Sequence, residues 1–228
     1  MIPLRDDVPS SRRPVIVLLI IAACVLVFLH LLQVPSARAM LRLLDNYSVV
    51  PAQFTGHAPI RGDTPLLLRL ATNLFLHGGW IHLLGNMLFL WIFGDNIEDA
   101  MGHGSFLVFY LICGMAGNVG HILTNPLAVE PTIGASGAIA GVLGAYLVLY
   151  QRARVWVLVP LFVIPQFLWV PAMLFLPVWA GLQLISGLAS LGGAMAGAAG
   201  GGVAWWAHVG GFITGALLAR VFVPSWAR

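Results

Sequence analysis

Charged residues are scarce in this chain, and lysine is absent altogether. Only 8% of the 228 residues are charged, whereas 60% are hydrophobic and the mean hydropathy is +0.94. Soluble domains carry about a quarter charged residues, so a soluble fold of this length would lack the groups to cover its surface. The composition therefore predicts a protein whose solvent is largely the lipid bilayer.

Clustered basic residues and metal-binding patterns are also missing. The eleven basic residues are all arginines scattered along the chain, which argues against nucleic acid as a partner. No HExxH motif or similar paired histidine spacing occurs, so no metal site is predicted. Cys24 and Cys113 each lie in an apolar run and are expected to be small buried hydrophobic residues without a required disulfide.

Long runs without charge predict one membrane domain, residues 14–223, between a polar cytoplasmic N-terminal tail (1–13) and a C-terminal tail (224–228). A crossing takes about 20 residues, and on that basis the fold class is an all-α polytopic bundle of six transmembrane helices. The expected spans are 14–34, 80–96, 105–123, 135–150, 168–189 and 203–223. The polar connection 35–79 is expected to include interfacial helices.

The stretch 155–190 is the hardest to interpret. It is apolar throughout and contains Pro160, Pro165, Pro171 and Pro177, yet it is too long for one crossing and short for two. We predict an interfacial or re-entrant piece over 155–167, followed by the fifth span and a Gly/Ala loop over 191–202. With the N-terminus inside, seven arginines lie on the inner side and four on the outer, which favours N-in, C-in topology.

Ser136 is the first candidate for chemistry. It lies in Gly134-Ala135-Ser136-Gly137, at the start of a predicted helix, where free backbone N–H groups can stabilise an anion. Taken alone, small residues around a serine are more typical of helix packing. However, sixteen residues from 135 to 150 reach only about 24 Å, less than the roughly 30 Å of hydrocarbon. A water-filled depression at this serine is therefore predicted.

His208 is the second candidate, because ionisable residues inside spans call for a functional hypothesis. Ala207, Gly211 and Gly215 form a stripe of small residues on its span, and the fourth span offers Gly137, Gly141 and Gly144. Two such faces allow close backbone approach and a Ser136–His208 hydrogen bond. If 155–189 crosses the membrane once, both residues lie near the outer surface.

His82 and Asn86 are four residues apart and share a helix face near the outer end of the second span. Both can donate hydrogen bonds to a developing oxyanion, although an equally common role is polar contact between helices. His121 is the alternative to His208 as the catalytic histidine, and His77 is expected to cap the second span. No carboxylate is placed to complete a triad, so a dyad is predicted.

These motifs, in this order, resemble the rhomboid intramembrane serine proteases over about residues 69–219. The fragments that carry the resemblance are Phe75-Leu76-His77-Gly78-Gly79-Trp80, His82-x-x-x-Asn86, Gly134-Ala135-Ser136-Gly137 and Ala207-His208-x-x-Gly211-x-x-x-Gly215. Some family members stack a tyrosine, four residues after the nucleophile, on the histidine. Here that position is Ala140, so the resemblance does not say what orients His208.

The resemblance implies a six-helix rhomboid fold and a serine endopeptidase that cleaves membrane-anchored proteins in or near their transmembrane segments. Ser136 would be the nucleophile and His208 the general base, with His82, Asn86 and the Ser136 backbone N–H stabilising the oxyanion. It implies no cofactor, transmembrane proteins and lipid as partners, and a multi-pass protein of a bacterial cell membrane. The alternatives are a non-catalytic rhomboid-like protein that binds transmembrane segments and, less favoured, a small transporter.

Overall fold

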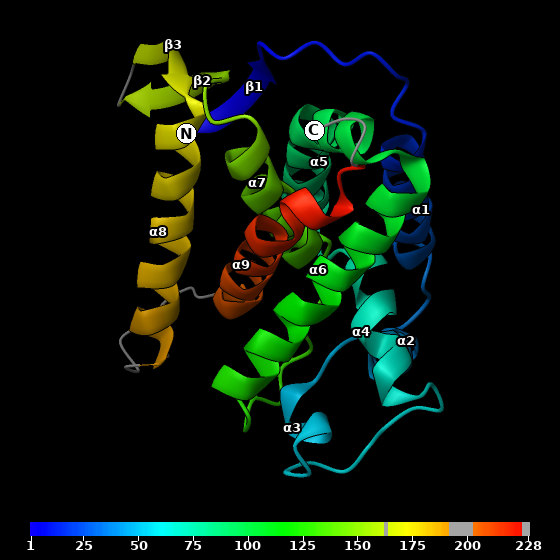
Figure 1. The fold of residues 1–228 in the computed structure, drawn as a ribbon. Helices are drawn as coiled ribbons and strands as arrows, with labels where there is room; N and C mark the ends of the chain where they lie inside the picture. The colour runs from blue at the N-terminus through cyan, green and yellow to red at the C-terminus, as the bar shows by residue number, and fades with distance from the viewer. Residues whose placement is uncertain (162–163, 192–202, 225–228) are drawn as a thin grey trace.

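The computed structural model describes residues 1–161, 164–191 and 203–224. Within these residues the chain is mainly helical, and six helices of 14 to 22 residues dominate it (Figure 1). They are α1 (Val15–Leu31), α5 (Trp80–Met101), α6 (His103–Thr124), α7 (Ser136–Leu149), α8 (Ala172–Leu191) and α9 (Trp205–Phe222). Each falls within a few residues of a span expected from the sequence.

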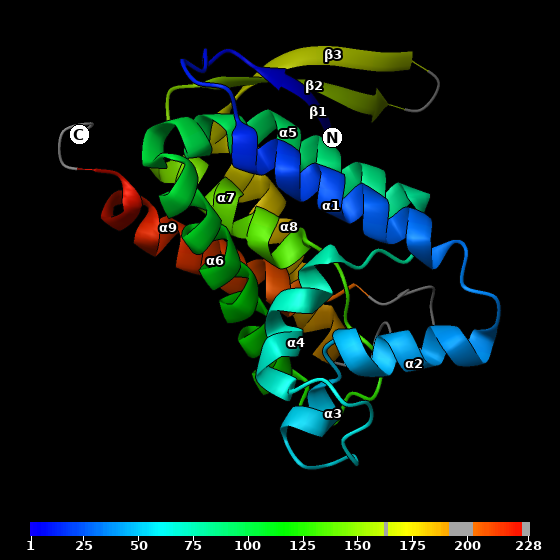
Figure 2. The same cartoon turned by 90° about the vertical axis from the view of Figure 1, so that its right-hand side faces the viewer.

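Four short helical pieces fill the long connection between α1 and α5. They are α2 (Ala37–Tyr47), α3 (Pro51–Phe54), α4 (Leu66–Thr72) and the 3-10 helix η1 (Asn73–Phe75). Figure 2 shows α2, α3 and α4 gathered at one end of the molecule, opposite the β-strands. We call the end with α2, α3 and α4 the cavity end, after the cavity described below, and the end with the strands the sheet end.

The sheet corrects the expectation of an all-helical chain. Strands β1 (Ile2–Asp6), β2 (Arg154–Leu161) and β3 (Ile164–Pro171) form one antiparallel sheet in the order β1-β2-β3. A β-hairpin thus occupies most of the segment predicted to be interfacial or re-entrant, and α8 begins at Ala172 rather than at residue 168. Strand β1 lies inside the segment expected to be a tail.

Side-chain chemistry explains why the hairpin forms. Three prolines between residues 160 and 171 break any helical hydrogen-bond ladder, while Val-Trp-Val-Leu-Val and Phe-Leu-Trp-Val are β-branched and aromatic sequences typical of strands. Strand β1 pairs with β2 and covers its second edge, with Arg5 opposite Trp156. The Arg5 guanidinium lies 5.1 Å from the Trp156 ring and 5.4 Å from the Trp169 ring, close enough for cation–π attraction.

Helices α7 and α9 pack backbone against backbone, which confirms the role predicted for the small residues. A Cβ added to Gly211 would overlap the carbonyl oxygen of Gly137, and one added to Gly215 would overlap that of Gly141. A Cβ at Gly144 would likewise overlap the carbonyl oxygen of Phe212. Only glycine allows this approach, so the stripe sets the distance between the two helices.

By length and apolar composition, two helices of the described part suffice to cross a membrane, namely α6 and α8. The pair Leu66–Phe75 and Trp80–Met101, bent by 87°, counts as a third if it forms one span. Helices α1 and α7 are apolar but shorter. Six spans therefore stay a prediction. The predicted loop 191–202 lies almost wholly outside the described residues, as does all but the first residue of the tail 224–228.

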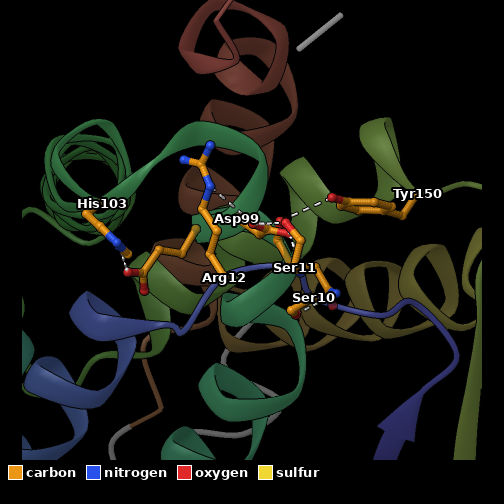
Figure 3. A network of polar contacts seen from close by, with 8 residues as sticks. Ser10, Ser11, Arg12, Asp99, His103 and Tyr150 are labelled. Carbon is orange, nitrogen blue, oxygen red and sulfur yellow. Dashed lines mark hydrogen bonds and ion pairs between the residues drawn. The ribbon is translucent and has the colours of Figure 1, made fainter.

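The sheet end is held by a network of carboxylates (Figure 3). Glu98, which is 1% exposed, accepts hydrogen bonds of 2.8 Å from the backbone N–H groups of Ile16 and Val17 and pairs with His103. The Asp99 carboxylate accepts hydrogen bonds from Ser11. Glu98 thereby satisfies free N–H groups at the start of α1 and ties that helix to α5. His103 is the first residue of α6.

Candidate active site

A cavity of about 830 Å³ lies where the N-terminal ends of α5, α7 and α9 meet. Much of its wall is glycine and apolar side chain, but it also contains polar side chains. Those of the residue types used in catalysis are His82, Asn86, Asn118, Ser136 and His208, and Trp80 and Thr132 also line the cavity. All four residues predicted as site residues thus line one cavity, as required if residues 155–189 cross the membrane once.

A glycine with positive φ and an amide pair position the loop before Ser136. Gly134 has a φ of +123°, a conformation that L side chains rarely adopt, and its N–H donates to the Asn73 carbonyl oxygen at 2.9 Å. Asn73 in turn exchanges two side-chain hydrogen bonds, of 3.1 and 2.8 Å, with Asn118 on α6. Because Asn73 and Asn118 are buried, these bonds keep the loop in one position.

Ser136 is the first residue of α7, and Ala135 at the N-cap provides no side-chain hydrogen bond. The first N–H groups of a helix have no partner within it, so those at the start of α7 are free to bind an anion. The Ser136 side chain is half-buried and makes no hydrogen bond to any of the described residues. Hydroxyl and backbone donor therefore lie together at the cavity wall.

His208 lies in the first turn of α9 and is 8% exposed. Its Nδ1 lies 2.7 Å from Oε1 of Gln183, which comes from α8. Two tryptophan rings, Trp179 and Trp205, have their centroids 6.0 and 6.1 Å from the imidazole. The aromatic neighbours of His208 thus come from α8 and α9, since Ala140 offers no ring on α7.

Close packing brings the neighbours of Ser136 and His208 together. A Cβ added to Gly137 would lie 3.4 Å from the carbonyl oxygen of Ala207. Among the described residues no hydrogen bond joins the two side chains themselves. In enzymes without bound substrate such bonds are often long and tighten when substrate binds. Both side chains line the cavity, and the hydrogen bond predicted between them is not formed in this structure.

His82 and Asn86 approach the same loop from α5. A Cβ added to Gly134 would lie 2.6 Å from Nε2 of His82 and 3.6 Å from Nδ2 of Asn86. The Asn86 amide also lies 3.1 Å from Nε2 of His77, whose ring stacks edge-on against His82. His77 was expected to cap α5, but the N-cap is Gly79 with no side-chain bond, so His77 supports the asparagine instead.

The rival histidine does not line this cavity. His121 lies near the C-terminal end of α6, where its Nδ1 is 3.3 Å from the Asn125 amide. Sequence reasoning overlooked Gln183 and Asn118. Both are uncharged polar residues inside apolar helices, and the rule that singled out His82 and Asn86 would have found them.

Similarity to known proteins identifies the family of this chain. A family model for the rhomboid domain matches residues 65–225, which is most of the chain and includes every residue of the cavity. The chain therefore belongs to the rhomboid family of membrane-embedded proteins.

Several relatives are named as proteases or rhomboid proteins. The chain is 44% identical to the rhomboid protease GluP of Bacillus subtilis over 79 residues, 35% of this chain and 15% of GluP. It is 37% identical to the mitochondrial rhomboid protein 1 of Saccharomyces cerevisiae over 133 residues, 54% of this chain and 38% of that protein. It is 31% identical to RHOMBOID-like protein 4 of Arabidopsis thaliana over 162 residues, 68% of this chain and 34% of that protein. The matches thus span well under half the length of each relative.

Proposed function

We propose that this protein is an intramembrane serine endopeptidase that uses a Ser136–His208 dyad. The observation that carries the proposal is the convergence of Ser136, His208, His82 and Asn86 on one cavity, with Ser136 at a helix N-terminus. Family membership and relatives named as proteases support the reaction class. No cofactor is needed, because every group used belongs to the chain.

The chemistry follows from the positions of these groups. His208 takes the Ser136 hydroxyl proton as Oγ attacks the carbonyl carbon of the scissile peptide bond. The charge that develops on the carbonyl oxygen is stabilised by the Ser136 backbone N–H, His82 and Asn86. The imidazolium then gives its proton to the leaving amine, which departs and leaves an acyl-enzyme. Water, deprotonated by His208, hydrolyses this ester and restores Ser136.

The substrate class follows from where the cavity lies. Helices α5, α7 and α9 are apolar, and the cavity lies at their N-terminal ends, so scissile bonds would lie in or near transmembrane segments. We propose six spans, α1 and α5–α9, across a bacterial cell membrane. The sheet end and both termini would lie on the cytoplasmic side. The seven-to-four distribution of arginines supports this orientation.

The test uses purified protein in detergent micelles or liposomes. A fluorophosphonate probe should label the wild type but not Ser136→Ala, and a panel of single-span substrates should be cleaved only by the wild type. Absence of Ser136-dependent labelling together with absence of cleavage would reject the proposal. If the protein neither labels nor cleaves but still binds the substrates, the result would favour a non-catalytic protein that binds transmembrane segments.

A further inference from the structure

The described part of the chain leaves His208 without a carboxylate partner. The ion pairs found there are Arg12–Asp99 and His103–Glu98, both at the sheet end. A neutral imidazole has two tautomers, and only the one protonated at Nδ1 leaves Nε2 free to accept a proton. A serine–histidine dyad therefore needs another group to select that tautomer.

Gln183 meets this need. Its Oε1 lies 2.7 Å from Nδ1 of His208, and the two side chains are 9% and 8% exposed, so water competes little for this hydrogen bond. Because a carboxamide oxygen can only accept, this contact is a hydrogen bond only when Nδ1 carries the proton. Nε2 then keeps its lone pair, as a general base requires.

Trp179 reinforces the contact. It lies four residues before Gln183, so both side chains leave the same face of α8. The Trp179 ring lies 6.0 Å from the imidazole at an interplanar angle of 33°. Trp179 thus restrains the plane of the imidazole ring, and Gln183 selects its tautomer.

Helix α8, which supplies both residues, is the less enclosed of the two described helices that are long and apolar enough to cross a membrane. Only 22% of its most apolar segment is buried, against 44% in α6. Figure 1 shows α8 at the edge of the bundle. The hydrogen bond to His208 therefore joins a peripheral helix to the centre of the site.

We propose that Gln183 is a positioning residue that holds His208 with Nδ1 protonated, and that the catalytic competence of His208 depends on α8 being packed against α9. This inference rests on the proposed endopeptidase function. Gln183 acts through His208 and is not expected to touch the substrate.

Two substitutions separate hydrogen-bond acceptance from packing. Gln183→Leu keeps the size of the side chain but removes the acceptor, and Gln183→Glu keeps an acceptor. Leu188→Ala, at a position on α8 that is 55% exposed, is the control for general effects on this helix. Purified full-length variants are compared for kcat and KM on a single-span substrate, for fluorophosphonate labelling rate, and for both rates against pH.

We expect Gln183→Leu to lower kcat and the labelling rate roughly 10- to 100-fold with little change in KM, by analogy with residues that orient ligating histidines. Gln183→Glu should stay within about tenfold of wild type, with the acidic limb of its pH–rate profile moved to higher pH because a carboxylate stabilises the imidazolium. Leu188→Ala should match wild type.

The outcomes distinguish the two proposals. If wild type neither labels nor cleaves, the proposed function is wrong. If wild type is active and folded Gln183→Leu matches it, or folded Gln183→Glu is as inactive as Gln183→Leu, the positioning role is wrong. Should Gln183→Leu fail to fold, Gln183→Glu decides alone, since an unchanged pH profile would reject the role.

Discussion

The two ends of the molecule are both polar but are built differently. At the sheet end, carboxylates such as Glu98 and Asp99 are paired with backbone N–H groups, a serine, an arginine or a histidine. The side chains that line the cavity include no carboxylate, lysine or arginine, and the Ser136 hydroxyl has no hydrogen-bond partner among the described residues. Satisfied charges stabilise a fold, whereas unused donors and acceptors beside a cavity remain available for chemistry.

The largest expected effect is on catalysis at the cavity end. Ser136→Ala and His208→Ala should each lower the rate of substrate cleavage by about 10⁴-fold or more, because each removes a group that the acyl transfer requires. Thermal unfolding in detergent should change little for Ser136→Ala, since its hydroxyl makes no hydrogen bond to any residue that the structure describes. A Ser136→Ala protein that unfolds far earlier than wild type would place this serine among the structural residues.

The next largest effect is on stability and concerns the packing of α7 against α9, the helix pair that connects the two ends. Gly215→Ala should lower the free energy of unfolding by about 3 kcal/mol, because its Cβ would overlap the Gly141 carbonyl oxygen. Gly181→Ala on α8 is the matched control, since a Cβ there meets nothing within 4 Å. The control should be neutral or stabilising by about 0.5 to 1 kcal/mol from helix propensity. Equal behaviour of the two variants in unfolding experiments would contradict the close packing.

At the sheet end, Glu98→Gln should lower the free energy of unfolding by about 2 kcal/mol. The change removes the charge that accepts hydrogen bonds from Ile16 and Val17 and pairs with His103. The rate of fluorophosphonate labelling of the remaining folded protein should be unchanged. A loss of labelling without a loss of stability would show that the two ends are not functionally separate.

The smallest expected effect is the pH dependence of folding stability that Asp6 confers. Desolvation raises the pKa of Asp6 from 3.8 to about 6, although Tyr146 donates a hydrogen bond to this carboxylate, which acts in the opposite direction. The folded state therefore binds the proton more tightly than the unfolded state, so stability falls as pH rises from about 4 to 6. Since Asp6 is partly exposed, the loss should be on the order of 1 kcal/mol.

Asp6→Asn tests this prediction, because asparagine keeps an oxygen for the Tyr146 hydroxyl but cannot ionise. Between pH 4 and 7 the midpoint of thermal unfolding should vary less for the variant than for wild type, and the variant should be the more stable at pH 7. A steeper dependence in the variant would show that Asp6 is stabilised in its charged form.

Much of the site could be predicted from sequence because its signals are local or topological. A serine after Gly134-Ala135 at a helix start, a histidine within a small-residue stripe and the His82/Asn86 spacing each depend on a few neighbouring residues. On the assumption that residues 155–189 cross the membrane once, the parity of crossings predicted that these residues lie at one end. Gln183 could not be assigned to His208 in this way, since their contact depends on how α8 packs against α9.

The sequence by itself determined that the chain is a membrane protein, roughly where its long helices lie and which four residues to expect at the site, because composition, apolar run length and helical spacing are properties of the chain. Only the tertiary structure decided that residues 154–171 pair with the N-terminal strand as a sheet and that Gln183 contacts the imidazole. Both depend on backbone and side-chain partners distant in sequence, which local patterns do not specify.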